Sequence, residues 1–176
     1  MAWQIDPNHA NLGFSGKHMV ISKVKGKFED YQVDLNVDEE NLANSAATIR
    51  VAVASVDSGF GQRDDHLRSA DFFDAEQYPY ITFATREIQP NGKDGHYRFI
   101  GDLTIRDVTR EVAFDGEVAG PIQDPWGGTR LALSAATKVN RKDWGLDWNL
   151  PLGAGNLLVS DEITLELDAE FVKQAA

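Results

Sequence analysis

The segment Glu162–Val172, with the sequence EITLELDAEFV, alternates apolar and polar residues almost without interruption. One parity carries the apolar residues Ile163, Leu165, Leu167, Ala169 and Phe171. Successive side chains of a β-strand point to opposite faces, so this pattern predicts a strand with one apolar and one polar face. Such strands are typical of antiparallel sheets that bury one face and expose the other.

The same period of two recurs along most of the chain, in segments near ten residues long: 12–18, 24–37, 47–53, 80–88, 97–105, 108–119 and 131–139. Within 24–37 the apolar parity changes between Phe28 and Tyr31, which predicts a β-bulge or a sharp bend. The turn-forming run Pro90–Gly95 predicts a hairpin between two of these strands.

Helical patterns are scarce. The best candidate is a short helix around Gln62–Ser69, where Asp64 and Arg68 would form an i, i+4 pair on one face. A second irregular region, Asn140–Gly155, fits neither the helix nor the strand period.

About eight long, consecutive antiparallel strands suggest either a sandwich or an up-and-down β-barrel. The predicted strands are longer than the usual ~5–6 residues, and a closed barrel leaves no sheet edge with unpaired backbone groups. Both points favour the barrel. Glycines on the apolar parity, such as Gly26 and Gly101, leave room in the interior or allow tight coiling. We therefore expect an all-β fold, a single domain over residues 1–176 with one or two short helices. Its interior either is filled by side chains, as in a purely structural barrel, or holds one small apolar ligand, and small interior residues such as Ala135 and Thr137 favour a cavity.

Composition excludes several classes of function. The 176 residues carry a net charge of −11, which argues against nucleic acid as a partner and against docking on anionic membranes. The chain has no cysteine, and no apolar run reaches the ~18 residues of a membrane span, so no integral membrane insertion is expected. The first residues lack a signal-peptide pattern, which predicts a cytoplasmic protein, or a periplasmic one if a leader has been removed.

The segment Arg63–Asp74 concentrates polar chemistry beside two aromatic residues. It can act as a structural lid, with charged groups tying loops together, or as a lid whose arginines hold the head group of a ligand. A third interpretation makes His66 a general base oriented by Asp64 or Asp65, in an enzyme acting on an apolar substrate. No nucleophile is placed beside it and the histidines lack metal-site spacing, so we predict no catalytic residue, no metal and no cofactor.

Six motifs in one order resemble the YceI-like family of polyisoprenoid-binding, lipocalin-like proteins. They are Trp3-Gln4-Ile5-Asp6 with His9, Phe14 with His18, Ser55–Gly59 followed by Arg63–Phe73, Tyr78–Phe83, Gly101–Thr109, and Asn140–Leu146. The resemblance implies an extended lipocalin-like barrel with an elongated apolar pore. It also implies non-catalytic binding of a long isoprenoid lipid, such as a polyprenyl phosphate or the prenyl tail of a quinone. Ala10 and Asp107 depart from the family's pattern, which often has a serine and a glycine there.

The predicted ligand is therefore an isoprenoid or another long-chain lipid, and a homodimer is left open. The predicted ligand-binding residues come from the apolar parity of the strands, from the Arg63–Asp74 segment and from the irregular region Asn140–Gly155. They are Phe14, His18, Phe28, Val51, Val53, Arg63, His66, Arg68, Phe72, Phe73, Phe83, Phe99, Leu103, Phe114, Leu133, Trp144 and Leu165.

Overall fold

The computed structural model describes residues 3–152 and 158–174. It contains the helix α1 (Gly61–Arg68) and three short 3-10 helices, η1 (Leu42–Asn44), η2 (Val53–Ser55) and η3 (Arg141–Trp144). Its strands are β1 (Trp3–His18), β2 (Ser22–Phe28), β3 (Tyr31–Asn36), β4 (Ala46–Ala52), β5 (Val56–Asp57), β6 (Tyr80–Pro90), β7 (His96–Ile105), β8 (Val108–Gln123), β9 (Thr129–Asn140) and β10 (Glu162–Lys173). No helix among these residues is long and apolar enough to cross a membrane.

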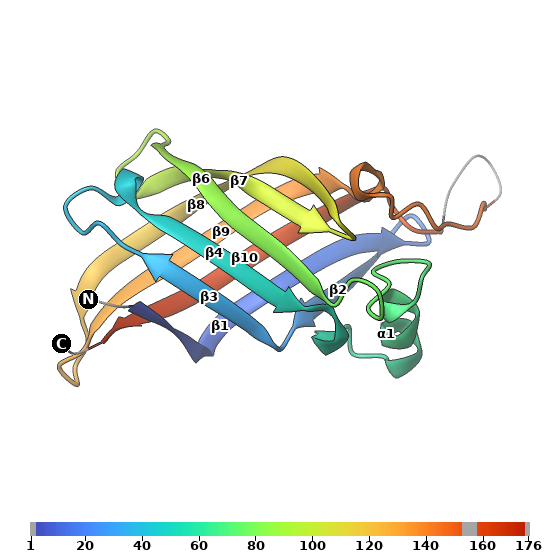
Figure 1. The fold of residues 1–176 in the computed structure, drawn as a ribbon, viewed down its shortest axis with the longest axis horizontal. Helices are drawn as coiled ribbons and strands as arrows, with labels where there is room; N and C mark the ends of the chain where they lie inside the picture. The colour runs from blue at the N-terminus through green and yellow to red at the C-terminus, as the bar shows by residue number, and fades with distance from the viewer. Residues whose placement is uncertain (1–2, 153–157, 175–176) are drawn as a thin grey trace.

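The strands form one antiparallel sheet that closes on itself. Consecutive strands pair from β6 to β10, β4 lies between β3 and β6, and β10 also pairs with β1. Trp3 of β1 pairs with Leu35 of β3, which completes the ring. The result is an elongated barrel, with α1 at one end and both chain termini at the other (Figure 1). The predicted up-and-down barrel is confirmed.

The predicted bend in the segment 24–37 lies between β2 and β3. Glu29 and Asp30 separate the two strands, which have different partners: β2 pairs with the second half of β1, and β3 pairs with β4. The parity change seen in the sequence therefore marks the point where one wall of the barrel turns.

Two interior glycines make room for aromatic rings and do not themselves form an empty space. A Cβ atom on Gly26 would lie 2.4 Å from Cζ of Phe14, and one on Gly101 would lie 2.3 Å from the carbonyl oxygen of Ala84 and 2.7 Å from Cζ of Phe83. All three distances are shorter than any normal contact, so larger residues at these positions would displace the neighbouring ring or strand. Glycine here serves tight packing of the barrel wall.

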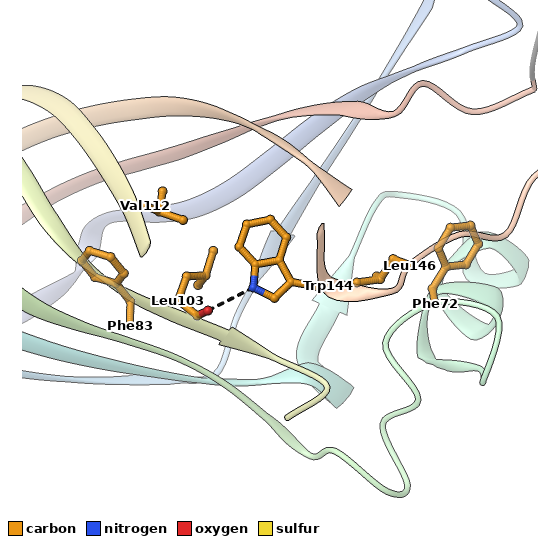
Figure 2. Close-up of a cluster of buried hydrophobic side chains, with 6 residues drawn as sticks. All are labelled: Phe72, Phe83, Leu103, Val112, Trp144 and Leu146. Atoms are coloured by element: carbon orange, nitrogen blue, oxygen red, sulfur yellow. Dashed lines mark hydrogen bonds between the residues drawn. The ribbon is translucent and has the colours of Figure 1, made fainter. Parts of the chain in front are cut away.

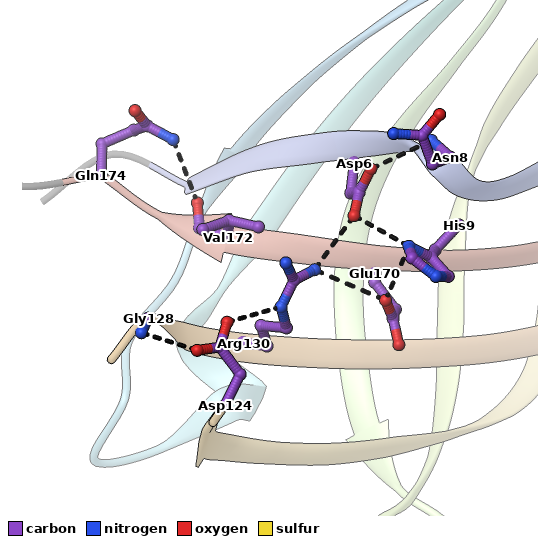
Figure 3. Close-up of polar contacts among 9 residues, drawn as sticks. All are labelled: Asp6, Asn8, His9, Asp124, Gly128, Arg130, Glu170, Val172 and Gln174. Carbon is purple, nitrogen blue, oxygen red and sulfur yellow. Dashed lines mark hydrogen bonds and ion pairs between the residues drawn. The ribbon is translucent and has the colours of Figure 1, made fainter. Parts of the chain in front are cut away.

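An excursion of β1 forms a polar cluster on the outside of the barrel (Figure 3). Ile5 pairs with Phe171 and Ala10 with Ala169, so residues 6–9 have fewer partners on β10 and bulge outward. Asp6 accepts hydrogen bonds from Nη1 of Arg130 at 3.0 Å and shares a 2.9 Å contact with Nδ1 of His9. The contact with His9, helped by the backbone N–H of residue 8 and by Arg130, lowers the pKa of Asp6 to about 2.

Candidate functional site

The interior of the barrel contains a cavity of about 670 Å³. Almost all of its wall is aliphatic or aromatic, and the lining extends from Leu35, Val37 and Leu42 near the termini to His18 and Arg63 near α1. A volume of this size lies within the range of ligand pockets in proteins. The apolar parity of the long strands is thus the surface of a cavity that runs along the barrel.

Two groups of aromatic rings line the cavity at the α1 end. Phe73 contacts Phe14 and Phe28, with ring centroids 6.2 and 5.9 Å apart. The ring of His66 lies 4.5 Å from that of Trp148 and 5.0 Å from that of Phe72, both at steep angles. Edge-to-face contacts of this kind stabilise a fixed arrangement of rings. Phe72 and Phe73 both line the cavity.

Trp144 enters the barrel from the second irregular segment (Figure 2). Its indole Nε1 donates a 3.0 Å hydrogen bond to the carbonyl oxygen of Leu103 on β7, and its ring packs with Phe83 and Val112 in a buried cluster. The hydrogen bond satisfies the one polar atom of the side chain, so the rest of the ring can form apolar wall. The segment that holds Trp144 lies at the same end of the barrel as the Arg63–Asp74 segment, because Leu146 and Phe72 belong to the same cluster.

A buried carboxylate ties α1 to the loop before it. Oδ1 of Asp64 accepts hydrogen bonds from the backbone N–H of Ser58 at 2.8 Å and from its hydroxyl at 2.5 Å. Arg63 donates from Nε to Ser58 Oγ and from Nη2 to Ser58 O. These bonds fix the helix across the mouth of the cavity.

Asp64 and Asp65 do not orient His66. Nε2 of His66 lies 2.9 Å from Oδ2 of Asp71, while Asp65 pairs with Nη1 of Arg68 at 3.0 Å. The predicted i, i+4 pair of Asp64 with Arg68 is therefore wrong: burial against Ser58 takes Asp64 away from it. The catalytic alternative loses the specific geometry on which it depended.

Arg141, at the start of η3, is a buried cation on the cavity wall. It is 5% exposed, and it donates to the carbonyl oxygens of Ser160 and Leu146. Its Nη2 has no hydrogen-bond partner among the described residues and lies 3.9 Å from Oδ1 of Asp161, beyond hydrogen-bond range. Burial lowers the pKa of the guanidinium and Asp161 opposes that shift, but an arginine stays protonated at neutral pH.

Fifteen of the predicted residues line this one cavity: Phe14, His18, Phe28, Val51, Arg63, His66, Phe72, Phe73, Phe83, Phe99, Leu103, Phe114, Leu133, Trp144 and Leu165. Val53 and Arg68 do not line it. β4 ends at Ala52, so Val53 belongs to η2 and is buried outside the alternation. Arg68 donates to the backbone oxygens of Ala54 and Val56 and so serves the loop before α1.

The polar cluster outside the barrel includes a set of groups that could hold a metal ion. One ligand atom each from Asp6, His9 and Glu170 lies within 4.8 Å of the others. Nη1 of Arg130, however, lies 3.0 Å from Asp6 and 3.5 Å from Glu170 and already supplies a positive charge. The arrangement is therefore better explained as a cluster of ion pairs that links β1, β9 and β10 than as a cation site.

The protein-family model of the YceI-like domain matches residues 3–171 of this sequence. This chain belongs to the YceI family. A UPF0312 protein of Staphylococcus epidermidis is 34% identical over 170 residues, which cover 96% of each chain. A UPF0312 protein of Vibrio cholerae is 34% identical over 166 residues, covering 94% of this chain and 83% of the relative.

Solved structures share the barrel. The Campylobacter jejuni YceI protein is 28% identical and superimposes with a TM-score of 0.77 over 90% of each chain. Burkholderia cenocepacia BcnA is 22% identical with a TM-score of 0.82, covering 95% of this chain and 99% of its own. A polyisoprenoid binding domain from Saccharophagus degradans is 14% identical, with a TM-score of 0.73 over 99% of each chain. The last two likenesses concern the fold alone.

Arg141 and Trp148 are among the residues of this YceI barrel that line the cavity beside the lid and were not predicted from the sequence. The motif Asn140–Leu146 includes Arg141, but a charged residue in an irregular segment reads as exposed. Trp148 follows in the same segment, where neither periodicity shows which way a side chain points. The signal available in the sequence was an arginine followed within seven residues by two tryptophans, Trp144 and Trp148.

Proposed function

We propose that this protein is a non-catalytic carrier that holds one long isoprenoid lipid, of the polyprenyl phosphate or prenylquinone type, or a similar long-chain amphiphile. The observation that carries the proposal is the apolar cavity along the barrel, about 670 Å³ in volume. The name of the solved polyisoprenoid-binding domain, which shares this fold, is in keeping with such a ligand.

The energetics suit a long apolar tail. Burial contributes about 0.8 kcal/mol per CH₂ group, so each five-carbon unit adds a few kcal/mol. Three or four units would offset association costs of ~4–15 kcal/mol and reach micromolar binding or better. To bind a tail of this kind, a cavity needs a matching shape and the exclusion of water more than specific polar partners.

We further propose that the ligand lies with its head at the α1 end. Several side chains that can donate hydrogen bonds line the cavity near that end, among them His18, Arg63, His66 and Arg141. Among them, Nη2 of Arg141 is buried and lacks a hydrogen-bond partner in the described residues. Because a buried N–H group without a hydrogen-bond partner is costly, a phosphate or quinone oxygen that reaches Nη2 would be held strongly.

Titration of the protein with geranylgeranyl phosphate and with geranylgeraniol, followed by tryptophan fluorescence, tests both parts. We expect both compounds to bind, with the phosphate at least tenfold tighter. In Arg141→Met the preference for phosphate should disappear while the prenol still binds. Lys142→Met, at the exposed neighbouring position, is the matched control and should behave like the wild type. Absence of binding by both compounds would contradict the carrier function, and equal affinities would contradict only the placement of the head.

A further inference from the structure

The turn between β1 and β2 exposes three consecutive apolar side chains. Met19, Val20 and Ile21 are 52%, 47% and 83% exposed, and they form the tip of the hairpin (Figure 1). Single exposed apolar residues are ordinary, but a contiguous group at a projecting tip is not. These side chains therefore need a partner surface to explain their position.

The same hairpin carries an unbalanced positive charge. Lys17 pairs directly with Lys23 across the two strands, and Lys25 follows on the same outer face, opposite Ser15. No acidic residue occurs between Phe14 and Phe28. Like charges directly opposite each other destabilise a strand pair, and the described residues provide no ion pair for any of these three lysines.

The backbone of the tip is also unfavourable for the residues it holds. Met19 has φ 55° and Val20 has φ 71°, in the left-handed region. Glycine or asparagine adopts such angles easily, whereas a β-branched valine does so at a cost. The hairpin thus departs from the most stable choice in its charges, its exposed apolar groups and its turn.

The tip projects beside the mouth of the cavity. His18, the last residue of β1, lines the cavity and pairs with Val159, and the backbone N–H of Met19 donates to Leu158 O. Phe60, just before α1, both lines the cavity and is 54% exposed. An object that contacts the hairpin tip would therefore lie against the α1 end of the cavity.

We propose that the β1–β2 hairpin docks the barrel on the surface of an anionic lipid membrane. Met19, Val20 and Ile21 would enter the interface between head groups and acyl chains, and Lys17, Lys23 and Lys25 would contact the phosphates. The net charge of −11 is an average over the molecule and does not describe this hairpin. Docking turns the mouth of the cavity toward the bilayer, which is the source of any lipid cargo.

Sedimentation with vesicles tests the proposal. The protein should bind vesicles of equal parts phosphatidylglycerol and phosphatidylcholine, bind pure phosphatidylcholine at least tenfold more weakly, and lose affinity as salt rises. The double variant Lys23→Gln/Lys25→Gln, which leaves the cavity-lining Lys17 unchanged, should lose at least tenfold, since each lysine near an anionic surface contributes roughly a fivefold factor. Lys93→Gln, on the β6–β7 hairpin at the other end, is the control for charge.

A tip variant separates docking from folding. Met19→Asn/Val20→Gly/Ile21→Thr should weaken binding to the anionic vesicles at least tenfold while its melting temperature stays equal or rises, because the turn becomes easier to form. A purely structural tip predicts the reverse, a lower melting temperature with unchanged vesicle binding. The control is Ile122→Thr/Trp126→Thr on the β8–β9 hairpin, where Trp126 is 85% exposed at the opposite end of the barrel.

The proposal would be overturned if the wild type bound neither the anionic nor the pure phosphatidylcholine vesicles. It would also be overturned if the β8–β9 variant alone lost binding to the anionic vesicles. Titration with geranylgeranyl phosphate in the absence of vesicles reports on the cavity independently. The hairpin variants should keep that binding, so failure of docking and failure of the carrier function give different results.

Discussion

At the scale of single residues, the partners of each arginine decide which one is available to a ligand. Arg63 uses two of its nitrogens on Ser58, and Arg68 binds backbone oxygens away from the cavity. Arg141 keeps one buried nitrogen without a hydrogen-bond partner in the described part of the chain. The cation best placed for a head group is therefore the one that lies deepest in the wall.

Asp107 is expected to affect the stability of the fold only through the backbone conformation of the turn that contains it. It connects β7 to β8 with φ 60°, a left-handed angle that favours glycine. Asp107→Gly should raise the free energy of unfolding in urea by about 1 kcal/mol. Asp34→Gly, at an exposed extended position of β3, is the control and should lower it. Destabilisation by Asp107→Gly would contradict the geometry of this turn.

His9 should make part of the stability depend on pH. Its hydrogen bond to Asp6 and the charge of Glu170 raise its pKa above the ordinary 6.5, while Arg130 opposes the shift. A raised pKa stabilises the fold fully below pH 6.5, and the contribution disappears as pH rises through the pKa of the folded state. Melting temperatures across this range should show His9→Gln to be less stable than the wild type in acid, with a gap that narrows in alkali. A gap that widens with pH would contradict the ion pairs.

At the scale of elements, α1 acts as a tied lid whose anchor is buried. Asp64→Ala removes the acceptor for two hydrogen bonds from Ser58 and leaves those donors partly buried. The free energy of unfolding should fall by about 2 kcal/mol.

Asp65→Ala is the matched control for this anchor, since the neighbouring carboxylate is exposed and makes only a surface ion pair with Arg68. It should cost less than about 1 kcal/mol in the same denaturation experiment. Equal losses in the two variants would show that α1 is not anchored through Asp64.

Periodicity predicted the elements well because side-chain alternation is a local consequence of strand geometry. The bend after Phe28, the hairpin at Pro90–Gly95 and the helix near Arg63 all followed from short stretches. The ion-pair partner of Arg68 could not be predicted in this way. The carboxylate of Asp64 accepts a hydrogen bond from Ser58, in a loop whose position helical spacing does not describe. The outward excursion at residues 6–9 was missed for a similar reason, since only pairing with β10 reveals it.

At the scale of the whole molecule, closure converts an apolar face into a cavity. Parity placed residues such as Phe99 and Leu165 on one face, and pairing of β1 with β10 encloses that face. How much space remains inside was not predictable, because Gly26 and Gly101 are covered by neighbouring groups and do not open the interior. The volume depends on how rings from distant strands pack against each other.

Two neighbouring residues of β9 make it possible to test whether the cavity holds a lipid tail. Ala135 is buried on the cavity wall, whereas Ala136 is exposed on the outer face. In Ala135→Phe the new ring should enter the cavity and exclude the tail, while Ala136→Phe should leave the cavity open.

Native mass spectrometry of the three proteins after incubation with geranylgeranyl phosphate measures this most directly. We predict a one-to-one complex for the wild type and Ala136→Phe, and at least a tenfold smaller bound fraction for Ala135→Phe at similar melting temperature. A wild type that takes up no prenyl lipid, or an Ala135→Phe variant that binds it undiminished, would contradict the account.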